Sequence, residues 1–146
     1  MRVYLDVCCL KRPFDDQSQP RIHLESEAVL ALLAAAPGPV EFVRSAALEL
    51  ENDQNPLAHR AAKVRLWLEA LPLLNAPDVP LADRTRELTA LGFKSFDALH
   101  VASAELLGAD VLCTCDDRLL AAARRHASAL KVRVAPPIDF VQEVLS

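Results

Sequence analysis

The sequence is poor in the features that mark fibrous, disordered and membrane-spanning proteins. Its 146 residues include only three glycines, and 52% of the residues are hydrophobic. A collagen-like chain needs glycine at every third position, and a disordered chain has few hydrophobic residues, so both classes are excluded. The longest apolar run, AVLALLAAA, ends after nine residues, whereas a membrane-spanning helix needs about 20. The N-terminal residues show no hydrophobic signal region, so we expect a cytoplasmic protein with no membrane association.

Cysteine and positive charge are also scarce. The four cysteines form a CC pair, Cys8 and Cys9, and a CTC group, Cys113 and Cys115. This pattern is unlike a secreted disulfide framework, and adjacent cysteines rarely bond to each other, so free thiols are expected. The net charge of −4 argues against a general nucleic-acid-binding coat. Binding of a polyanion would depend on local patches: Lys11 with Arg12, Arg21 with His23, and Arg118 with Arg124 and Arg125.

The hydrophobic pattern alternates between strands and helices. A chain of this length can bury a core without disulfides, so we expect a single domain over residues 1–146. Residues 2–7 are apolar at most positions, which is typical of a parallel strand covered on both faces, and a loop is expected from there through Pro20. The further strands are expected over 40–44, 110–114 and 131–135, and the helices over 21–36, 45–52, 56–74, 79–91, 96–108, 116–129 and 137–146.

Ser45 and Ser95 are the expected N-caps of two of these helices, and Gly92 is expected to end the helix over 79–91. Strands separated by helices favour right-handed crossovers and parallel pairing. The expected fold class is therefore α/β, with a three-layer α/β/α sandwich around a central, mainly parallel sheet of four to five strands.

Four acidic residues lie close to the carboxyl ends of the expected strands, where parallel sheets usually have their functional sites. Asp6 ends the first strand, Asp116 follows VLCT, Asp97 lies in the first turn of its helix, and Glu49 follows the second strand. The carboxyl ends of parallel strands share one edge, so these groups could meet there. Converging carboxylates repel one another unless a cation joins them. Hard oxygen ligands suit Mg²⁺ or Mn²⁺, and these ions also bind phosphate oxygens.

Each acid also has an ordinary structural interpretation. Asp97 could complement its helix dipole, which contributes about 0.3–1 kcal/mol, and Asp116 could cap the next helix. Glu49 could simply face water, and Glu51 is only two residues away. Asp6 is the hardest to explain in this way, because it interrupts an apolar run.

Four short motifs, in order, resemble the PIN-domain family of metal-dependent ribonucleases, which includes the VapC-like toxins of bacterial toxin–antitoxin pairs. They are VYLDVCC with Asp6, SAALE with Ser45 and Glu49, FDALHVASA with Asp97, His100 and Ala102, and TCD with Thr114 and Asp116. The opening YLDVCCLKRPFDD is also similar to a subgroup of PIN proteins with a double cysteine and RPFDD. The expected fold is accordingly PIN-like.

The resemblance implies hydrolysis of RNA phosphodiester bonds by metal-activated water, leaving a 5′-phosphate and a 3′-hydroxyl. One or two Mg²⁺ or Mn²⁺ ions would be held by Asp6, Glu49, Asp97 and Asp116. It also implies an antitoxin partner and a homodimer. Val7 departs from the family pattern, which usually has a polar residue there, and Asp117 could replace or assist Asp116.

Two other function classes stay open at this point. One is a PIN module that binds RNA or protein without catalysis. The other is a receiver-like regulator that is phosphorylated on Asp6 or Asp116, but KVRVAPP does not place a lysine after its strand, as such a regulator requires.

The remaining notable residues have packing as their simplest interpretation. The first and third strands would be neighbours in a PIN-like sheet, so the four thiols could approach one another. Buried inert thiols are the expected outcome, with a zinc or redox site as the alternative. His100 is expected to be mainly structural. Trp67 and the leucines of its helix would belong to the core or to a dimer surface.

Overall fold

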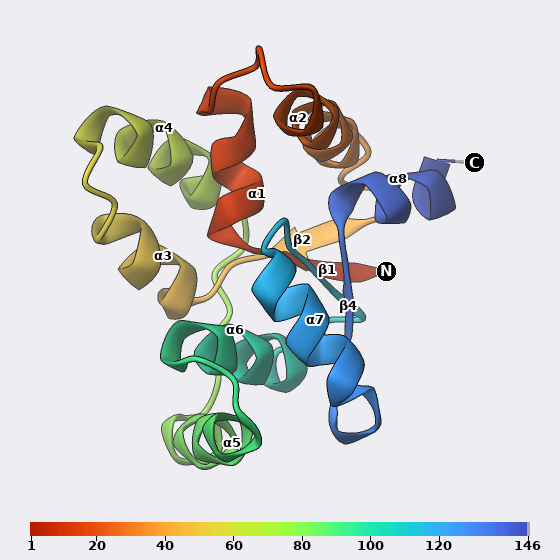
Figure 1. Cartoon of the computed structure of the whole chain (residues 1–146). Helices are drawn as coiled ribbons and strands as arrows, with labels where there is room; N and C mark the ends of the chain where they lie inside the picture. The colour runs from red at the N-terminus through yellow and green to blue at the C-terminus, as the bar shows by residue number, and fades with distance from the viewer. Residues whose placement is uncertain (146) are drawn as a thin grey trace.

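A four-stranded parallel sheet forms the centre of the computed structural model, which describes residues 1–145 (Figure 1). The strands are β1 (Arg2–Leu5), β2 (Glu41–Val43), β3 (Val111–Cys113) and β4 (Arg133–Ala135), in the order β2-β1-β3-β4. Tyr4 pairs with Val43 on one side and with Leu112 on the other. The predicted parallel sheet and the predicted neighbourhood of the first and third strands are both confirmed.

The apolar character of β1 explains its central position. Val3, Tyr4 and Leu5 are at most 1% exposed, as expected for a strand with neighbours on both sides and helices on both faces. The strand ends at Leu5 rather than at Val7, although the Asp6 N–H still donates to the Cys113 carbonyl at 3.0 Å. Asp6 therefore lies at the sheet edge, directly after the last paired residue.

Helices cover both faces of the sheet and complete the predicted three-layer α/β/α sandwich. In Figure 1, α2 and α8 lie on one side of the strands and α5 and α6 on the other. The helices are α1 (Val7–Lys11), α2 (Pro20–Ala34), α3 (Ala46–Asp53), α4 (Ala58–Glu69), α5 (Asp78–Leu91), α6 (Ser95–Leu106), α7 (Asp117–Arg125) and α8 (Pro137–Leu145). Two 3₁₀ turns, η1 (Arg12–Phe14) and η2 (Ala127–Ala129), complete the set.

The loop predicted through Pro20 is wrong in its first half, because helix α1 and turn η1 occupy residues 7–14. Asp6 caps this helix by accepting a hydrogen bond from the Val7 N–H. Val7, Cys9 and Leu10 are buried, and this packing stabilises a helix too short to form alone. As a result, Cys8 and Cys9 lie on a helix and not at the end of a strand.

The remaining boundaries agree with the sequence in part. Ser45 caps α3 through its hydroxyl, and Gly92 ends α5 with a φ of 113°, both as predicted. Ser95 is instead the first residue of α6, which follows Lys94 without a side-chain cap. The helices predicted over 56–74 and 116–129 are shorter, ending at Glu69 and Arg125. Ser146, the end of the last predicted helix, lies outside the described residues.

Trp67 on α4 is partly buried and packs against Phe14, with 5.1 Å between the ring centroids. None of the helices within residues 1–145 combines the length and the apolar character that a membrane span requires.

Candidate metal centre

The carboxyl edge of the sheet brings several acidic residues to one place. Asp6 links β1 to α1, and Asp116 follows β3 and caps α7. These two strands are neighbours in the middle of the sheet. After β1 the chain continues to the edge strand β2, and after β3 it continues to the other edge strand, β4. Such a switch point is where open parallel sheets bind ligands. Asp97 lies in the first turn of α6.

Asp6 is the buried centre of this group, with 5% of its surface exposed. Its Oδ1 accepts a hydrogen bond from the Val7 N–H at 2.8 Å, and its Oδ2 accepts one from the Thr114 hydroxyl at 2.9 Å. Burial raises the pKa of Asp6 to about 8, with a further contribution from the Cys8 thiol, and the opposing effects of His100 and Thr114 are smaller. The carboxyl group therefore retains a proton near neutral pH unless a cation is present.

Glu51 and His100 approach Asp6 closely. Their ligand atoms and those of Asp6 all lie within 4.8 Å of one another. His100 Nε2 is 3.4 Å from Glu51 Oε2 and 3.9 Å from Asp6 Oδ1. Although this nitrogen is buried, it has no hydrogen-bond partner among the described residues.

The other ring nitrogen of His100, Nδ1, is hydrogen-bonded on the side away from the carboxylates. Nδ1 lies 2.7 Å from the Tyr4 hydroxyl, which lies 2.7 Å from the Ser45 hydroxyl. Burial raises the pKa of Tyr4, so this hydroxyl keeps its proton. Burial opposes the charged form of His100, but Glu51 and Asp6 outweigh it and raise the pKa of the imidazole. The chain from Ser45 to His100 thus fixes the ring with Nε2 facing the carboxylates.

Asp97 and Asp116 extend the acidic group. The pKa of Asp97 is raised to about 6, first by partial burial and then by the charges of Asp116 and Asp6. Asp116 Oδ1 accepts the Arg118 N–H at 2.9 Å, and the Asp116 N–H donates to the Thr114 hydroxyl at 3.1 Å. Asp116 is therefore a helix cap, and its charge also acts on Asp97.

The structure does not bring Glu49 into this group. Its carboxylate pairs with Arg44, and its side chain is 41% exposed. Because a helix turns about 100° per residue, Glu49 and Glu51 point to different sides of α3. Glu51 follows the buried Ala47 and Leu48 by four and three residues, so it lies on the same, inward-facing side of α3. This helical spacing is the sequence signal that favours Glu51 over Glu49.

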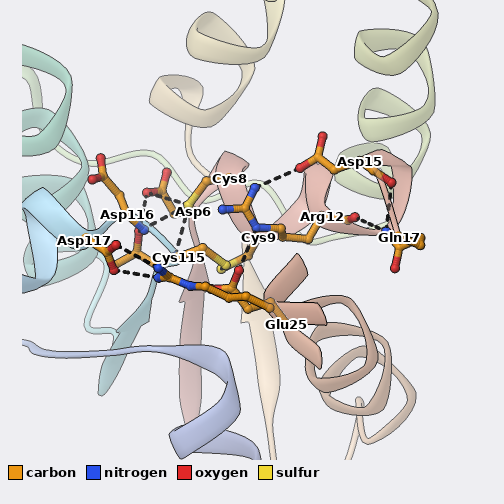
Figure 2. A network of polar contacts seen from close by, with 12 residues as sticks. Asp6, Cys8, Cys9, Arg12, Asp15, Gln17, Glu25, Cys115, Asp116 and Asp117 are labelled. Atoms are coloured by element: carbon orange, nitrogen blue, oxygen red, sulfur yellow. Dashed lines mark hydrogen bonds and ion pairs between the residues drawn. The ribbon is translucent and has the colours of Figure 1, made fainter. Parts of the chain in front are cut away.

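Asp117 also points elsewhere. Its two carboxylate oxygens accept hydrogen bonds from Arg21 at 2.6 and 2.9 Å, and this guanidinium lowers the pKa of the exposed Asp117. The ion pair joins α7 to α2 (Figure 2 shows Asp117 beside Asp116). Asp116, and not Asp117, is the residue whose charge acts on Asp97.

Positive side chains border the acids on one side. A cavity of about 300 Å³ is lined by Asp97 together with Lys94, Arg118 and Arg125. Three cations beside a carboxylate group suit a ligand that carries its own negative charges, such as a phosphodiester chain.

The donor set fits a divalent cation. Two carboxylates and one imidazole, those of Asp6, Glu51 and His100, lie within 4.8 Å of one another, and the charges of Asp116 and Asp6 act on Asp97. Hard oxygen donors of this kind are the ligands of Mg²⁺ and Mn²⁺. The buried His100 Nε2 is the clearest sign, because it faces Glu51 and Asp6 without a well-aligned hydrogen bond, which is costly in a protein interior. A cation would also favour the charged forms of Asp6 and Asp97, whose pKa values are raised first by burial and then by neighbouring groups.

The model of the PIN domain family matches residues 3–125, so the chain belongs to this family. Among solved structures, a similar chain comes from the crystal structure of VapBC2 from Rickettsia felis bound to a DNA fragment from their promoter. The match has a TM-score of 0.55 and 14% identity, and it covers 93% of this chain and 98% of the other. A comparison with curated proteins gave no significant match.

Proposed function

We propose that the protein is a divalent-metal-dependent endoribonuclease whose metal site consists of Asp6, Glu51, Asp97 and Asp116. The observation that carries this proposal is the close approach of Asp6, Glu51 and the buried Nε2 of His100, within 4.8 Å of one another, together with the charges of Asp116 and Asp6 that act on Asp97. Membership of the PIN family supports it. Glu51 takes the place that the sequence suggested for Glu49.

When bound, Mg²⁺ or Mn²⁺ would lower the pKa of a water molecule and screen the phosphate charge. The Thr114 hydroxyl holds the Asp6 carboxylate and also accepts a hydrogen bond from the Asp116 N–H. It therefore supplies the polar interaction that Val7 cannot, since the Val7 side chain is buried and only its N–H reaches Asp6. Val7 is compatible with an intact site for this reason.

The other polar residues have roles in orientation and binding. Tyr4 and Ser45 orient His100, as the hydrogen-bond partners of metal-binding side chains do in other metal sites. Lys94, Arg118 and Arg125 would bind the RNA backbone next to Asp97. Such interactions hold the substrate without reading its sequence.

A role as the toxin of a toxin–antitoxin pair follows as a finer proposal. The structural neighbour is part of a VapBC2 assembly with promoter DNA, and similarity of fold over 93% of the chain supports an antitoxin partner here too. A homodimer remains a prediction from the family resemblance.

A cleavage assay tests the proposed activity. Purified protein is incubated with a broad set of RNAs and Mn²⁺, and 5′-phosphate ends on the products are expected. Asp97→Asn removes the charge at nearly constant shape and should abolish cleavage, as should EDTA. Cleavage by Asp97→Asn at the wild-type rate would overturn the proposal. Absence of cleavage by wild type on every RNA would favour the non-catalytic module.

A further inference from the structure

Three of the four thiols lie together beside the acidic centre. The sulfurs of Cys8, Cys9 and Cys115 are all within 4.8 Å of one another, and the Cys9 and Cys115 sulfurs are 3.5 Å apart (Figure 2). In a strand, one side chain of an adjacent pair would point away. Because Cys8 and Cys9 lie on α1 instead, both can face the segment after β3.

Hydrogen bonds to the backbone hold two of the three sulfurs, those of Cys8 and Cys9, in this arrangement. Cys8 Sγ accepts the Cys115 N–H at 3.2 Å, and Cys9 Sγ donates to the Cys113 carbonyl at 3.4 Å. The three side chains are thus attached to two elements, α1 and the connection between β3 and α7, whose positions are set by the sheet. Little ordering is needed before they could act together.

We propose that Cys8, Cys9 and Cys115 form a binding site for one soft divalent metal ion, such as Zn²⁺ or Cd²⁺. With a Zn–S bond of about 2.3 Å, two ligands of a tetrahedral ion lie about 3.8 Å apart. The observed spacing, 3.5 Å for one pair and no more than 4.8 Å for the others, brackets this value. Small side-chain rotations are enough to close the site.

The charge balance is also suitable. Binding converts three thiols to three thiolates, forms three metal–sulfur bonds and releases three protons, so the site acquires a net charge of −1. Arg12 and its ion-pair partner Glu25 lie near the thiols in Figure 2, and their opposite charges both act on Cys115. Cys9 and Cys115 are buried, whereas Cys8 is partly exposed, so an ion would enter from the Cys8 side.

This site differs in chemistry from the acidic centre. Thiolates prefer Zn²⁺, Cd²⁺ and Cu⁺, whereas carboxylates prefer Mg²⁺ and Mn²⁺. The two sites nevertheless touch, because Cys8 Sγ lies 3.5 Å from Asp6 Oδ2. The thiol site goes beyond the proposed function and does not depend on it.

Cadmium binding provides the test. The full chain in a thiol-free reductant is titrated with Cd²⁺, and thiolate-to-cadmium charge-transfer absorption is recorded. We expect saturation at one ion per chain. Since changes to groups that only support metal ligands already reduce affinity about 10- to 100-fold, Cys9→Ser and Cys115→Ser should weaken binding at least 100-fold. Cys113→Ala removes the thiol outside the group, and Asp97→Asn alters the acidic centre without changing the cap of α1, so both should keep the absorption.

A second measurement does not need variants. One equivalent of Cd²⁺ should protect Cys8 of the wild-type protein from alkylation, as followed by peptide mass spectrometry, while excess Mg²⁺ should not. The proposal is overturned if wild type shows no charge-transfer absorption, if Asp97→Asn abolishes it, or if Cys8 is alkylated equally fast with and without Cd²⁺.

Discussion

At the scale of single residues, the two glutamates of helix α3 have different partners, and only one of them lies in the candidate metal site. Glu51 lies beside His100 and Asp6, whereas Glu49 pairs with Arg44. If the site works as proposed, the rate of RNA cleavage should fall by more than about tenfold in Glu51→Gln, because the substitution removes a charged metal ligand. Glu49→Gln is the matched control and should cleave nearly as wild type does. The reverse order of the two rates would place the metal on the other side of α3.

The buried carboxyl of Asp6 predicts an unusual pH dependence of stability. Its pKa is about 8 in the folded chain against 3.8 unfolded, so the folded state binds the proton more tightly. The stabilisation is complete below pH 3.8 and is lost as the pH rises toward 8. In EDTA, the free energy of unfolding of wild type relative to Asp6→Asn should therefore fall across this range, measured by urea denaturation at several pH values. A constant or rising difference would contradict the assignment.

At the scale of elements, the position of α6 matters most, because this helix carries Asp97 and His100. Glu105 near its end is buried and accepts hydrogen bonds from Arg84 of α5 and from the Lys131 N–H. Without Glu105, Arg84 would keep Glu87 and the Ala129 carbonyl as partners. The loss is therefore that of charge-assisted hydrogen bonds, at a cost of about 1.5–3 kcal/mol.

Glu105→Ala should accordingly lower the free energy of unfolding by about 2 kcal/mol in chemical denaturation. Glu87 also pairs with Arg84 but is 64% exposed, so Glu87→Gln should cost less than about 1 kcal/mol. Equal effects of the two substitutions would show that Glu105 does not anchor α6 against α5.

Some elements could be predicted from the sequence because their signals are local. The apolar run of β1, the Ser45 cap and Gly92 each act within a few residues, and all three agree with the structure. Helix α1 could not be predicted, because its stability comes from burying Val7, Cys9 and Leu10 against distant parts of the chain. The neighbouring strands predicted that the thiols could approach one another, but the selection of Cys8, Cys9 and Cys115 depends on that helix and could not be predicted for the same reason.

In the candidate site, too, some residues could be placed from local sequence signals and others depend on packing between distant segments. Asp6 and Asp116 could be placed at the sheet edge because each follows a strand, and parallel strands end together. The choice between Glu49 and Glu51 required the rotation of α3 about its axis, which is fixed by packing against α4 and α6. The position of His100 Nε2 between Glu51 and Asp6 depends on the packing of distant segments, and no sequence pattern predicts it.

At the scale of the whole molecule, a net charge of −4 must be reconciled with a polyanionic substrate. Lys94, Arg118 and Arg125 supply positive charge locally, beside Asp97. Arg118→Gln with Arg125→Gln should weaken RNA binding and reduce its dependence on salt. The log–log slope should fall by about 0.7 for each phosphate that the double variant no longer neutralises.

Fluorescence anisotropy with a labelled single-stranded RNA at several salt concentrations gives this slope. Arg133→Gln is a suitable control, because Arg133 begins β4 at the opposite edge of the sheet and pairs with Glu143. If the control changes the slope as much as the double variant does, the RNA is not bound along the cavity beside Asp97.

The central claim is that the carboxyl edge of the sheet is a divalent-cation site. Calorimetric titration with Mn²⁺ tests it without knowledge of the RNA target. Wild type should bind one or two Mn²⁺ ions, Glu49→Gln should bind as wild type does, and Asp97→Asn should bind at least about tenfold more weakly. Absence of Mn²⁺ binding by the wild-type protein, or unchanged binding by Asp97→Asn, would contradict the claim.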